Sequence, residues 1–371
     1  MSRHNVLILG AYGLGGKHIV SGLLKLGNIH ILASGRNEKK LEELKNFHSS
    51  QLLSTLKLDI NNSLELAQAC QGMDLVINCV GPYSLRGVKI AQIALKNNCS
   101  YIDYAGEQHH YRQIRKLDDE AKNRQLMLMT TAGMGPGITT LIMLDAIQKM
   151  TEVDSVDFYY AHGRFSGPEE GLGSIMGIVV ESGIGTVSYK EGKYVTEKLG
   201  ANIKKVTMPE PYGEVNMLCM PTADVLLISE SADIKSMHTY FMITSKPPKE
   251  LFTVLKFMKP HKFPWLYSLI KGRMKQWMHQ DYIAGVEQGL SSGGTIRLVF
   301  KGKPNNIDIL FHFNDSGICT SYLPVILTKL YVEKKIKKHG VLIPSDVMDL
   351  NSMQNELKAI DVHLDIDMIQ S

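Results

Sequence analysis

The sequence has few cysteines, and they are scattered along the chain. The five cysteines stand at positions 70, 79, 99, 219 and 319, and no two of them form a Cys-x-x-Cys pair. Such a pattern builds neither a disulfide framework nor a zinc site. The sequence therefore predicts a cytoplasmic protein, kept in a reducing compartment and without a metal centre.

Long apolar runs and a strong charge of one sign are also missing. No apolar stretch reaches the roughly 18 residues that a membrane-spanning helix needs. The first predicted strand begins so close to Met1 that we expect no signal peptide. The net charge of +4 over 371 residues argues against a dedicated nucleic-acid binder. The length favours two or three globular domains.

Glycine, by contrast, is concentrated where the chain begins. Val6–Leu9 predicts a buried strand of a parallel sheet, and Lys17–Leu26 has the apolar spacing of a helix. A strand, a glycine turn and a helix form the unit that binds a dinucleotide pyrophosphate, although a plain tight turn is the alternative. The predicted cofactor contacts in this turn are Gly10, Tyr12, Gly13, Leu14, Gly15 and Gly16.

The end of the second predicted strand, residues 29–33, is where such a fold meets the adenosine ribose. An NAD site usually has Asp or Glu there, but no acidic residue comes before Glu38. Arg36 offers a planar cation suited to a 2′-phosphate, and Ser34 offers a hydroxyl donor. We therefore expect NADP to be preferred over NAD. The alternative is that Arg36 is a solvated loop residue.

Two later strand ends are predicted to reach the cofactor. Asp59, after the third strand, is expected either to accept from the adenine amino group or to cap the next helix. The apolar run that ends at Asn78 is followed by a sharp turn at Gly81 and Pro82, and then by Tyr83. Because ligands bind at the carboxyl edge of open parallel sheets, we expect the residues of this second strand end, from Asn78 to Tyr83, to lie beside the cofactor.

Acid–base groups gather at the same predicted edge. Asp103 and Glu107 follow the next strand, and a second glycine-rich turn, residues 133–137, follows the strand after that. Glu107 is the preferred acid–base candidate, because burial beside a cofactor would raise its pKa. The alternative is that Glu107 only caps the following helix.

Four segments together resemble the saccharopine dehydrogenase-like oxidoreductases. Members of that family show similar patterns in the same order: a G-x-x-G-x-x-G start, then V-x-N-x-x-G-P-Y, Y-x-D-x-x-G-E and G-x-x-P-G segments. Here these are residues 10–16, 76–83, 101–107 and 133–137. The resemblance implies an α/β fold: a Rossmann-type parallel sheet, then an α+β domain, with a C-terminal helix returning to the first domain.

The sequence also departs from the lysine-pathway enzyme of that family. At the last of these turns, the pattern typical of saccharopine reductase is Gly-Leu-Asp-Pro-Gly. This chain has Gly135 in place of the Asp. After the next strand, the pattern typical of the reductase is Cys-Gly-Gly. This chain has His-Gly-Arg there, at residues 162–164. We therefore expect a relative with a different substrate.

The domain boundaries that we predict follow from this resemblance. Residues 1–150 form the Rossmann domain, 151–315 an α+β domain for substrate and dimerisation, and 316–371 a helix and tail on the first domain. Within the second domain, residues 246–285 are expected to form a helical cap over the substrate cleft. The basic segment 256–279 contains both tryptophans. The alternative is that this segment contacts an acidic membrane surface or a protein partner. A homodimer is an assembly that this organisation allows.

The function that these patterns favour is an NADP-dependent oxidoreductase acting on a small, unidentified substrate. The groups available to move a proton are Tyr83, Asp103, Glu107 and His162. The alternative is a non-catalytic NADP-binding redox sensor or scaffold, which would keep the glycine turn and lack an acid–base group, as Gly135 hints.

Overall fold

The computed structural model describes residues 4–164, 167, 171–197, 202–242 and 262–370. The chain divides into two compact units. The first unit comprises residues 1–106, 110–138 and 317–360, and the second comprises residues 107–109, 139–316 and 361–371. None of the helices in the described ranges is long and apolar enough to cross a membrane.

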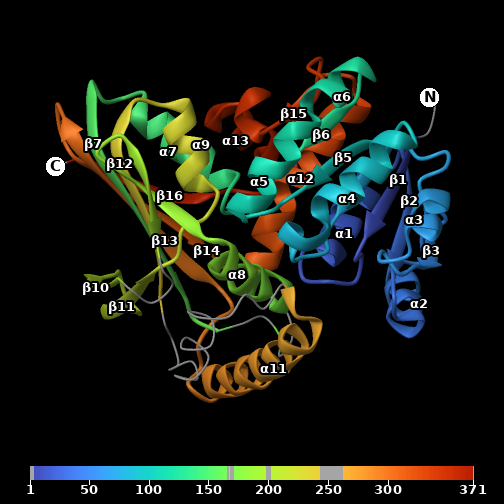
Figure 1. Cartoon of the computed structure of the whole chain (residues 1–371), viewed down its shortest axis with the longest axis horizontal. Coiled ribbons are helices and arrows are strands. Elements are labelled where there is room, and N and C mark those ends of the chain that lie inside the picture. Colours follow the sequence, from blue (N-terminus) through green and yellow to red (C-terminus); the bar gives the residue numbers. More distant parts are fainter. Residues whose placement is uncertain (1–3, 165–166, 168–170, 198–201, 243–261, 371) are drawn as a thin grey trace. The chain divides into compact units, whose positions relative to one another are not determined.

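The first unit contains a seven-stranded sheet in the order β15-β6-β5-β4-β1-β2-β3 (Figure 1). Every neighbouring pair in it is parallel. The strands are β1 (His4–Leu9), β2 (Ile29–Gly35), β3 (Leu53–Lys57), β4 (Leu75–Asn78), β5 (Ser100–Asp103), β6 (Met127–Met129) and β15 (Gly340–Leu342). The order reverses beside β1, so the sheet has the doubly wound topology that binds ligands at the carboxyl ends of its strands.

Helices connect these strands and cover the sheet. They are α1 (Gly16–Leu26), α2 (Glu38–His48), α3 (Ser63–Ala69), α4 (Tyr83–Lys96), α5 (Gln108–Ile114), η1 (Arg115–Leu117), α6 (Asp118–Asn123), α12 (Ser316–Val332), η3 (Pro344–Asp346) and α13 (Leu350–Lys358). Alternate residues of the strands, such as Leu7 and Tyr101, form one buried cluster with Ile90 of α4 and Ala121 of α6. The predicted Rossmann-type sheet is confirmed.

The C-terminal helix α12 belongs to the first unit, as the resemblance implied. Gly22 of α1 packs so closely on Val325 of α12 that a side chain at position 22 would clash. The helix ends at Val332, before a basic run at residues 334–338. The backbone leaves it at Lys334, which has a φ of +57°, so the remaining basic residues of that run lie beyond the helix.

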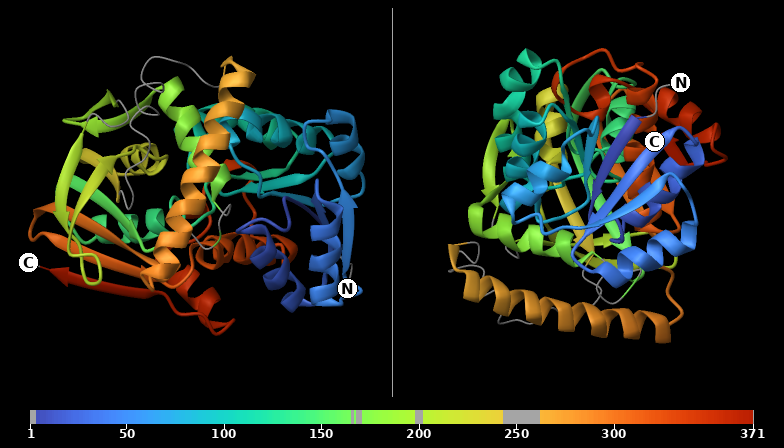
Figure 2. Two further views of the ribbon diagram at one scale, coloured as in Figure 1. Left: turned by 90° about the horizontal axis from the view of Figure 1, so that it is seen from below. Right: turned by 90° about the vertical axis from the view of Figure 1, so that its right-hand side faces the viewer.

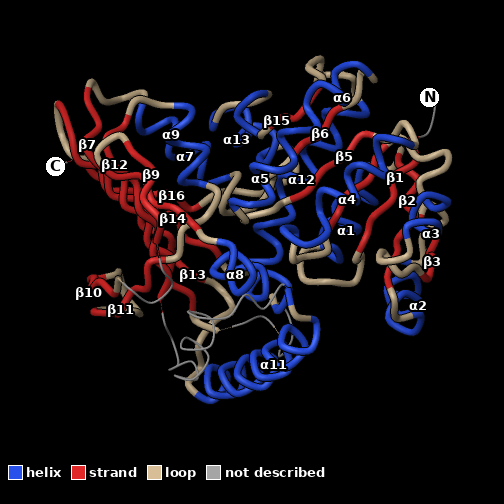
Figure 3. Tube along the Cα trace, in the orientation of Figure 1, coloured by secondary structure: helices blue, strands red, loops and turns tan. Residues whose placement is uncertain are grey.

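The second unit contains a nine-stranded mixed sheet (Figure 3). Its order is β10-β11-β12-β7-β13-β14-β16, and β8 pairs with β12 and β9. The strands are β7 (Glu152–His162), β8 (Thr186–Lys190), β9 (Lys193–Glu197), β10 (Ile203–Thr207), β11 (Glu214–Cys219), β12 (Ile234–Met242), β13 (Gly294–Lys303), β14 (Ile307–Phe313) and β16 (Asp365–Gln370). Its helices are α7 (Ile138–Ile147), α8 (Leu172–Ile184), α9 (Asp224–Ser231) and α11 (Pro264–Glu287).

From residue 264 onward the basic segment lies in α11, which packs on α8 (Figure 2). Leu266, Ile270 and Met274 of α11 share a buried cluster with Met176 and Val179 of α8. The part of the predicted cap before residue 262 lies outside the described residues. Whether the segment covers a substrate cleft stays a prediction.

Two predicted boundaries differ from the structure. The first unit gives way to the second at residues 138/139 rather than at 150, because α7 packs within the second unit. The tail was expected on the first domain, but β16 pairs antiparallel with β14 in the second sheet. Alternating residues across residues 365–369 are half-buried and exposed, which is the pattern of an edge strand with one covered face.

Candidate functional site

The turn between β1 and α1 has the backbone geometry of an anion cradle. Gly10 has a φ of +75°, and a Cβ on Gly16 would clash with the Gly10 carbonyl oxygen. Within the described part of the chain, no acceptor pairs with the amide N–H groups of Tyr12, Leu14, Gly15 and Gly16. Unpaired amides at the start of a helix are the donors that hold a pyrophosphate.

The sequence of α1 leaves this end of the helix to an anion. Gly15, at the N-cap, offers no side chain, and no acidic residue occupies the first helical turn. Neither a capping side chain nor a carboxylate therefore competes for the amides or for the positive end of the helix dipole. These residues fit a dinucleotide as the sequence predicted.

Three strand ends meet around this turn. A Cβ on Gly10 would clash with Val80, in the loop that follows β4 and that also contains Gly81 and Pro82. Gly15 faces the hydroxyl of Tyr104, just after β5, and Gly133 lies on the other side of Tyr104. The first glycine turn, the β4 and β5 ends and the second glycine turn thus form one cluster at the carboxyl edge of the sheet.

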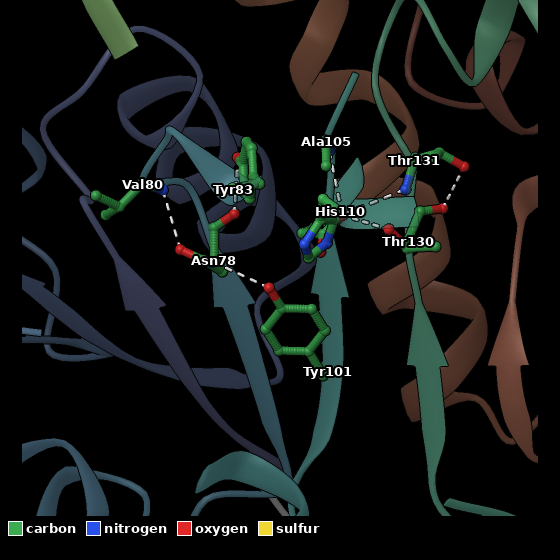
Figure 4. Close-up of polar contacts among 9 residues, drawn as sticks. Asn78, Val80, Tyr83, Tyr101, Ala105, His110, Thr130 and Thr131 are labelled. Carbon is green, nitrogen blue, oxygen red and sulfur yellow. Dashed lines mark hydrogen bonds and ion pairs between the residues drawn. The ribbon is translucent and has the colours of Figure 1, made fainter. Parts of the chain in front are cut away.

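Asn78 and Tyr83 are engaged with the protein itself (Figure 4). The Asn78 amide donates to the Tyr101 hydroxyl (2.9 Å), and its oxygen accepts from the Val80 N–H (3.0 Å). The Tyr83 hydroxyl donates to the Asn78 carbonyl (3.1 Å). Burial raises the pKa of Tyr83 well above its ordinary value. These side chains shape the β4 turn, and Tyr83 is poorly suited to release a proton; their place beside the cofactor stays a prediction.

Asp103 is fully buried in a hydrogen-bond network, and Figure 4 shows its partners His110, Thr130 and Thr131. Its carboxylate lies 2.7 Å from His110 Nε2 and accepts from the Thr130 hydroxyl (2.8 Å) and the Ala105 amide (3.1 Å). Burial alone would raise the pKa of Asp103, but His110 and these hydrogen bonds outweigh it and hold that pKa below its ordinary value. Asp103 therefore ties the ends of β5 and β6 to α5, and its catalytic role stays a prediction.

The loop after β2 differs from the predicted donor set in one residue. Ser34 is buried, and its hydroxyl donates to the Ile8 carbonyl (3.1 Å), so this donor is used within the protein. Arg36 is exposed, and its guanidinium has no partner among the described residues. The Tyr12 hydroxyl instead reaches this loop and accepts from the Arg36 and Asn37 amides at 3.1 and 3.0 Å.

Asp59 does not cap the next helix, and its predicted contact with the adenine stays a prediction. Its carboxylate accepts from the backbone and side-chain nitrogens of Asn61 at 3.0 and 2.8 Å. Asn62, rather than Asp59, caps α3. Short polar side chains commonly close such turns on their own backbone.

The two remaining acid–base candidates both lie in the second unit. Glu107 is buried against α8, where a Cβ on Gly177 would lie 2.5 Å from Glu107 Oε1. His162 ends β7, and burial lowers its pKa, although Asp281 opposes the shift. The side-chain amide of the neighbouring Gln108 donates to the Val187 carbonyl (2.8 Å), and its oxygen accepts from the Val187 N–H (2.9 Å).

Two residues of the cofactor cluster were not predicted as site residues. Tyr104 fills the space between Gly15 and Gly133, and its hydroxyl donates to the Cys79 carbonyl (3.4 Å). Gly317, at the start of α12, packs on Leu14. The strand-end position of Tyr104 was a signal that could have been used, whereas no local pattern links residues 14 and 317.

Comparison with known proteins identifies the part of the chain that contains this cluster. A family model described as the saccharopine dehydrogenase NADP-binding domain matches residues 6–129. Over residues 6–129 the chain is therefore similar to that NADP-binding domain. The predicted resemblance is confirmed, and the NADP-binding domain supports NADP as the cofactor.

The curated relatives are distant and match only in part. A lipid droplet localized protein of Caenorhabditis elegans is 27% identical over 143 residues, 36% of this chain and 34% of its own length. A probable mitochondrial saccharopine dehydrogenase-like oxidoreductase of Arabidopsis thaliana is 24% identical over 143 residues, 35% of this chain and 32% of its own length. The matches thus span about a third of each relative.

One solved structure resembles the whole chain. Saccharopine dehydrogenase (L-Glu forming) of Saccharomyces cerevisiae, in its apo form, matches with a TM-score of 0.68 and 15% identity. The alignment covers 99% of this chain and 100% of the yeast chain. At this identity the match establishes the fold of the NADP-binding domain and of the unit that follows it.

Proposed function

We propose that the protein is an NADP-dependent oxidoreductase that transfers hydride to or from a small substrate. The observation that carries the proposal is the uncapped start of α1, where the amides of Tyr12, Leu14, Gly15 and Gly16 have no acceptor among the described residues. A bound NADP would supply the hydride chemistry, and the protein would supply position and electrostatics. The family name of residues 6–129 supports the same cofactor.

The preference for NADP over NAD is part of this proposal. Arg36 is exposed at the end of β2, and its cation suits a 2′-phosphate. The carboxylate that follows, Glu38, lies 3.5 Å from the Lys57 ammonium, within ion-pairing distance. The ribose end of the site therefore offers more donors and positive charge than acceptors.

Glu107 and His162 are the residues proposed to move the substrate proton. Tyr83 and Asp103 are less suitable, since both are buried in hydrogen bonds that hold the sheet edge. A lowered pKa keeps the His162 ring neutral near pH 7, so it can accept a proton from an alcohol or amine substrate. Glu107 remains the first choice, as a buried carboxyl next to the strand end.

Turnover separates an oxidoreductase from a non-catalytic NADP-binding sensor or scaffold. The assay follows NADPH absorbance with panels of carbonyl, imine and enoyl compounds, using wild type, Glu107→Gln and His162→Gln. Loss of turnover in one variant, with cofactor affinity and melting temperature unchanged, supports the proton role. NADPH binding without turnover of any of the three substrate classes favours the sensor or scaffold.

A second proposed activity is binding to an anionic membrane surface through α11, as an alternative to a protein partner or a cap. Trp265 and Leu269 lie one turn apart and are 64% and 57% exposed. Exposed Lys262 and Arg273 lie near them. Exposed aromatic and aliphatic side chains beside basic ones suit the interface of an acidic bilayer. The lipid-droplet name of the worm relative is consistent with this proposal.

Vesicle co-sedimentation tests the membrane proposal. We expect the protein to pellet with phosphatidylserine-containing vesicles, and Trp265→Ala with Leu269→Ala to reduce the bound fraction severalfold. Phe47→Ala is the matched control, because Phe47 is 82% exposed on α2. Equal binding by all three proteins, or none by wild type, would remove the membrane proposal. Cytoplasmic location and a homodimer also remain proposals, to be tested by fractionation and by sedimentation velocity.

A further inference from the structure

Tyr12 has an unusual place in the cofactor turn. Its ring lies against Gly35 at the end of β2, where a Cβ would clash with the ring. Its hydroxyl oxygen accepts hydrogen bonds from the backbone amides of Arg36 (3.1 Å) and Asn37 (3.0 Å). Tyr12 thus joins the pyrophosphate turn to the loop that faces the adenosine ribose.

The Tyr12 hydroxyl has one hydrogen-bonding function that the described residues do not use. A phenol offers one O–H donor and a limited acceptor capacity on its oxygen. Here that oxygen accepts from two amides, so what remains is the O–H donor. No acceptor for that donor occurs among the described residues. The group that completes the set must therefore accept a hydrogen bond.

The surroundings indicate that this acceptor is anionic. The Arg36 guanidinium is exposed and unpaired within the described ranges. The Lys40 ammonium lies 5.8 Å from the centre of the Tyr12 ring. The Asn37 side chain is already used as the cap of α2, where it accepts from the Lys40 amide. A phosphate oxygen accepts hydrogen bonds without donating and is favoured by both cations.

We propose that Tyr12 is a specificity-determining residue that donates a hydrogen bond to the 2′-phosphate of NADP. It takes the donor role that we predicted for Ser34, whose hydroxyl donates to the Ile8 carbonyl. Tyr12 also holds the Arg36 loop through the two amides, so that the guanidinium faces the same phosphate. This inference rests on the proposed function, because it needs NADP in the site.

Binding of three probes to Tyr12→Phe tests the inference. NADPH and NADH are titrated by cofactor fluorescence, and adenosine 2′,5′-bisphosphate by competition. Loss of a hydrogen bond to a charged group predicts a fall of about tenfold to a hundredfold in affinity for NADPH and the bisphosphate. NADH affinity is expected to stay within about twofold, because NADH has no 2′-phosphate.

Tyr331→Phe is the matched control, since it removes a hydroxyl in the same unit that donates to the Asp74 carbonyl before β4. We expect it to bind all three probes as wild type does. An equal loss for NADPH and NADH in Tyr12→Phe would make Tyr12 a structural support only. A higher affinity of Tyr12→Phe for NADPH would mean that the phosphate binds the Arg36 and Asn37 amides, which the Tyr12 hydroxyl otherwise occupies. Either result overturns the inference while leaving the proposed function intact, whereas a wild type that binds neither NADPH nor the bisphosphate defeats both.

Discussion

At the scale of single residues, the site is built from groups with different tasks. The unpaired backbone amides of Tyr12, Leu14, Gly15 and Gly16 form the anion cradle. Buried side chains such as Asn78 and Asp103 hold the strand ends that surround it. Exposed Arg36 is the residue expected to distinguish the two nicotinamide cofactors.

Arg36→Ala should weaken NADPH binding and leave NADH binding nearly unchanged. A charge-assisted hydrogen bond to phosphate contributes about 1.5–3 kcal/mol, which corresponds to roughly tenfold to a hundredfold in affinity. Fluorescence titration of both cofactors measures the ratio. Equal affinities of the wild type for NADPH and NADH would show that Arg36 reads no phosphate.

Asp103→Asn should destabilise the fold by about 3–5 kcal/mol at pH 7, because it breaks a buried pair and leaves donors facing an amide. The pKa of Asp103 is lowered in the folded protein. Its stabilising effect is therefore fully present above the unfolded Asp pKa of about 3.9, and is lost as pH falls through the lower folded value. Urea unfolding at pH 7 and at pH 3–4 should show the difference between variant and wild type shrinking in acid.

Exposed Asp59 supplies the control for that experiment. Asp59→Asn changes a carboxylate that bonds only within its own turn, so we expect a change below about 1 kcal/mol at either pH. A deficit of Asp103→Asn that is the same at both pH values would contradict the assigned role of the carboxylate.

Single residues also show what the sequence could and could not reveal. The glycine positions were predictable because backbone conformation and close approach restrict them to glycine, as at Gly10 and Gly16. The partner of a hydroxyl was not predictable. Ser34 and Tyr83 donate to backbone carbonyls that only the folded sheet brings near them.

At the scale of elements, α12 supports the cofactor turn from far along the chain. Gly317 at its start packs on Leu14, and Val325 packs on Gly22 of α1. The cradle is thus held on the side of α1 by a helix that comes after β14 in the chain.

Gly317→Ala should lower both stability and cofactor affinity. Its Cβ would meet Leu14 atoms at 2.7–2.9 Å, and such overpacking costs about 1–3 kcal/mol. Displacement of the Leu14 amide should weaken NADPH binding severalfold. Gly272→Ala is the control: Gly272 lies within α11 with nothing near its Cβ, so the change should stabilise by about 0.5–1 kcal/mol. Unchanged NADPH affinity in Gly317→Ala would separate α12 from the site.

Element boundaries were predictable where the signal was local. Glu191–Gly192 form the turn between β8 and β9, and the pair is a local hairpin signal because both residues have positive φ, at +47° and +75°. Strands β15 and β16 were not predicted, because their partners β6 and β14 are distant in sequence. The basic run after Val332 has helical composition, yet the helix ends before it.

At the scale of the whole molecule, the chain visits the first unit, forms the second, and returns to both. Residues 317–360 rejoin the first unit, and residues 361–371 rejoin the second. The NADP-binding cluster lies wholly within the first unit. Cofactor binding should therefore tolerate damage to the second sheet.

Deletion of residues 361–371 tests this division. Loss of β16 removes the partner of β14, so amide hydrogen exchange across residues 307–313 should accelerate strongly. NADPH affinity should stay within about twofold of wild type, since the first unit keeps all its residues. A variant with protected β14 amides, or one that is folded yet has lost NADPH binding, would contradict the division into two units.

The central claim is that the turn between β1 and α1 holds the pyrophosphate of NADP. Thermal unfolding with and without NADPH, on wild type and Gly13→Val, tests it most directly. Gly13 lies in the cradle, and a valine side chain there would occupy the space of the phosphates. We expect NADPH to raise the melting temperature of wild type, and to leave that of a cooperatively folded Gly13→Val unchanged. An equal NADPH-dependent rise in both proteins, or no rise in wild type, would contradict the account.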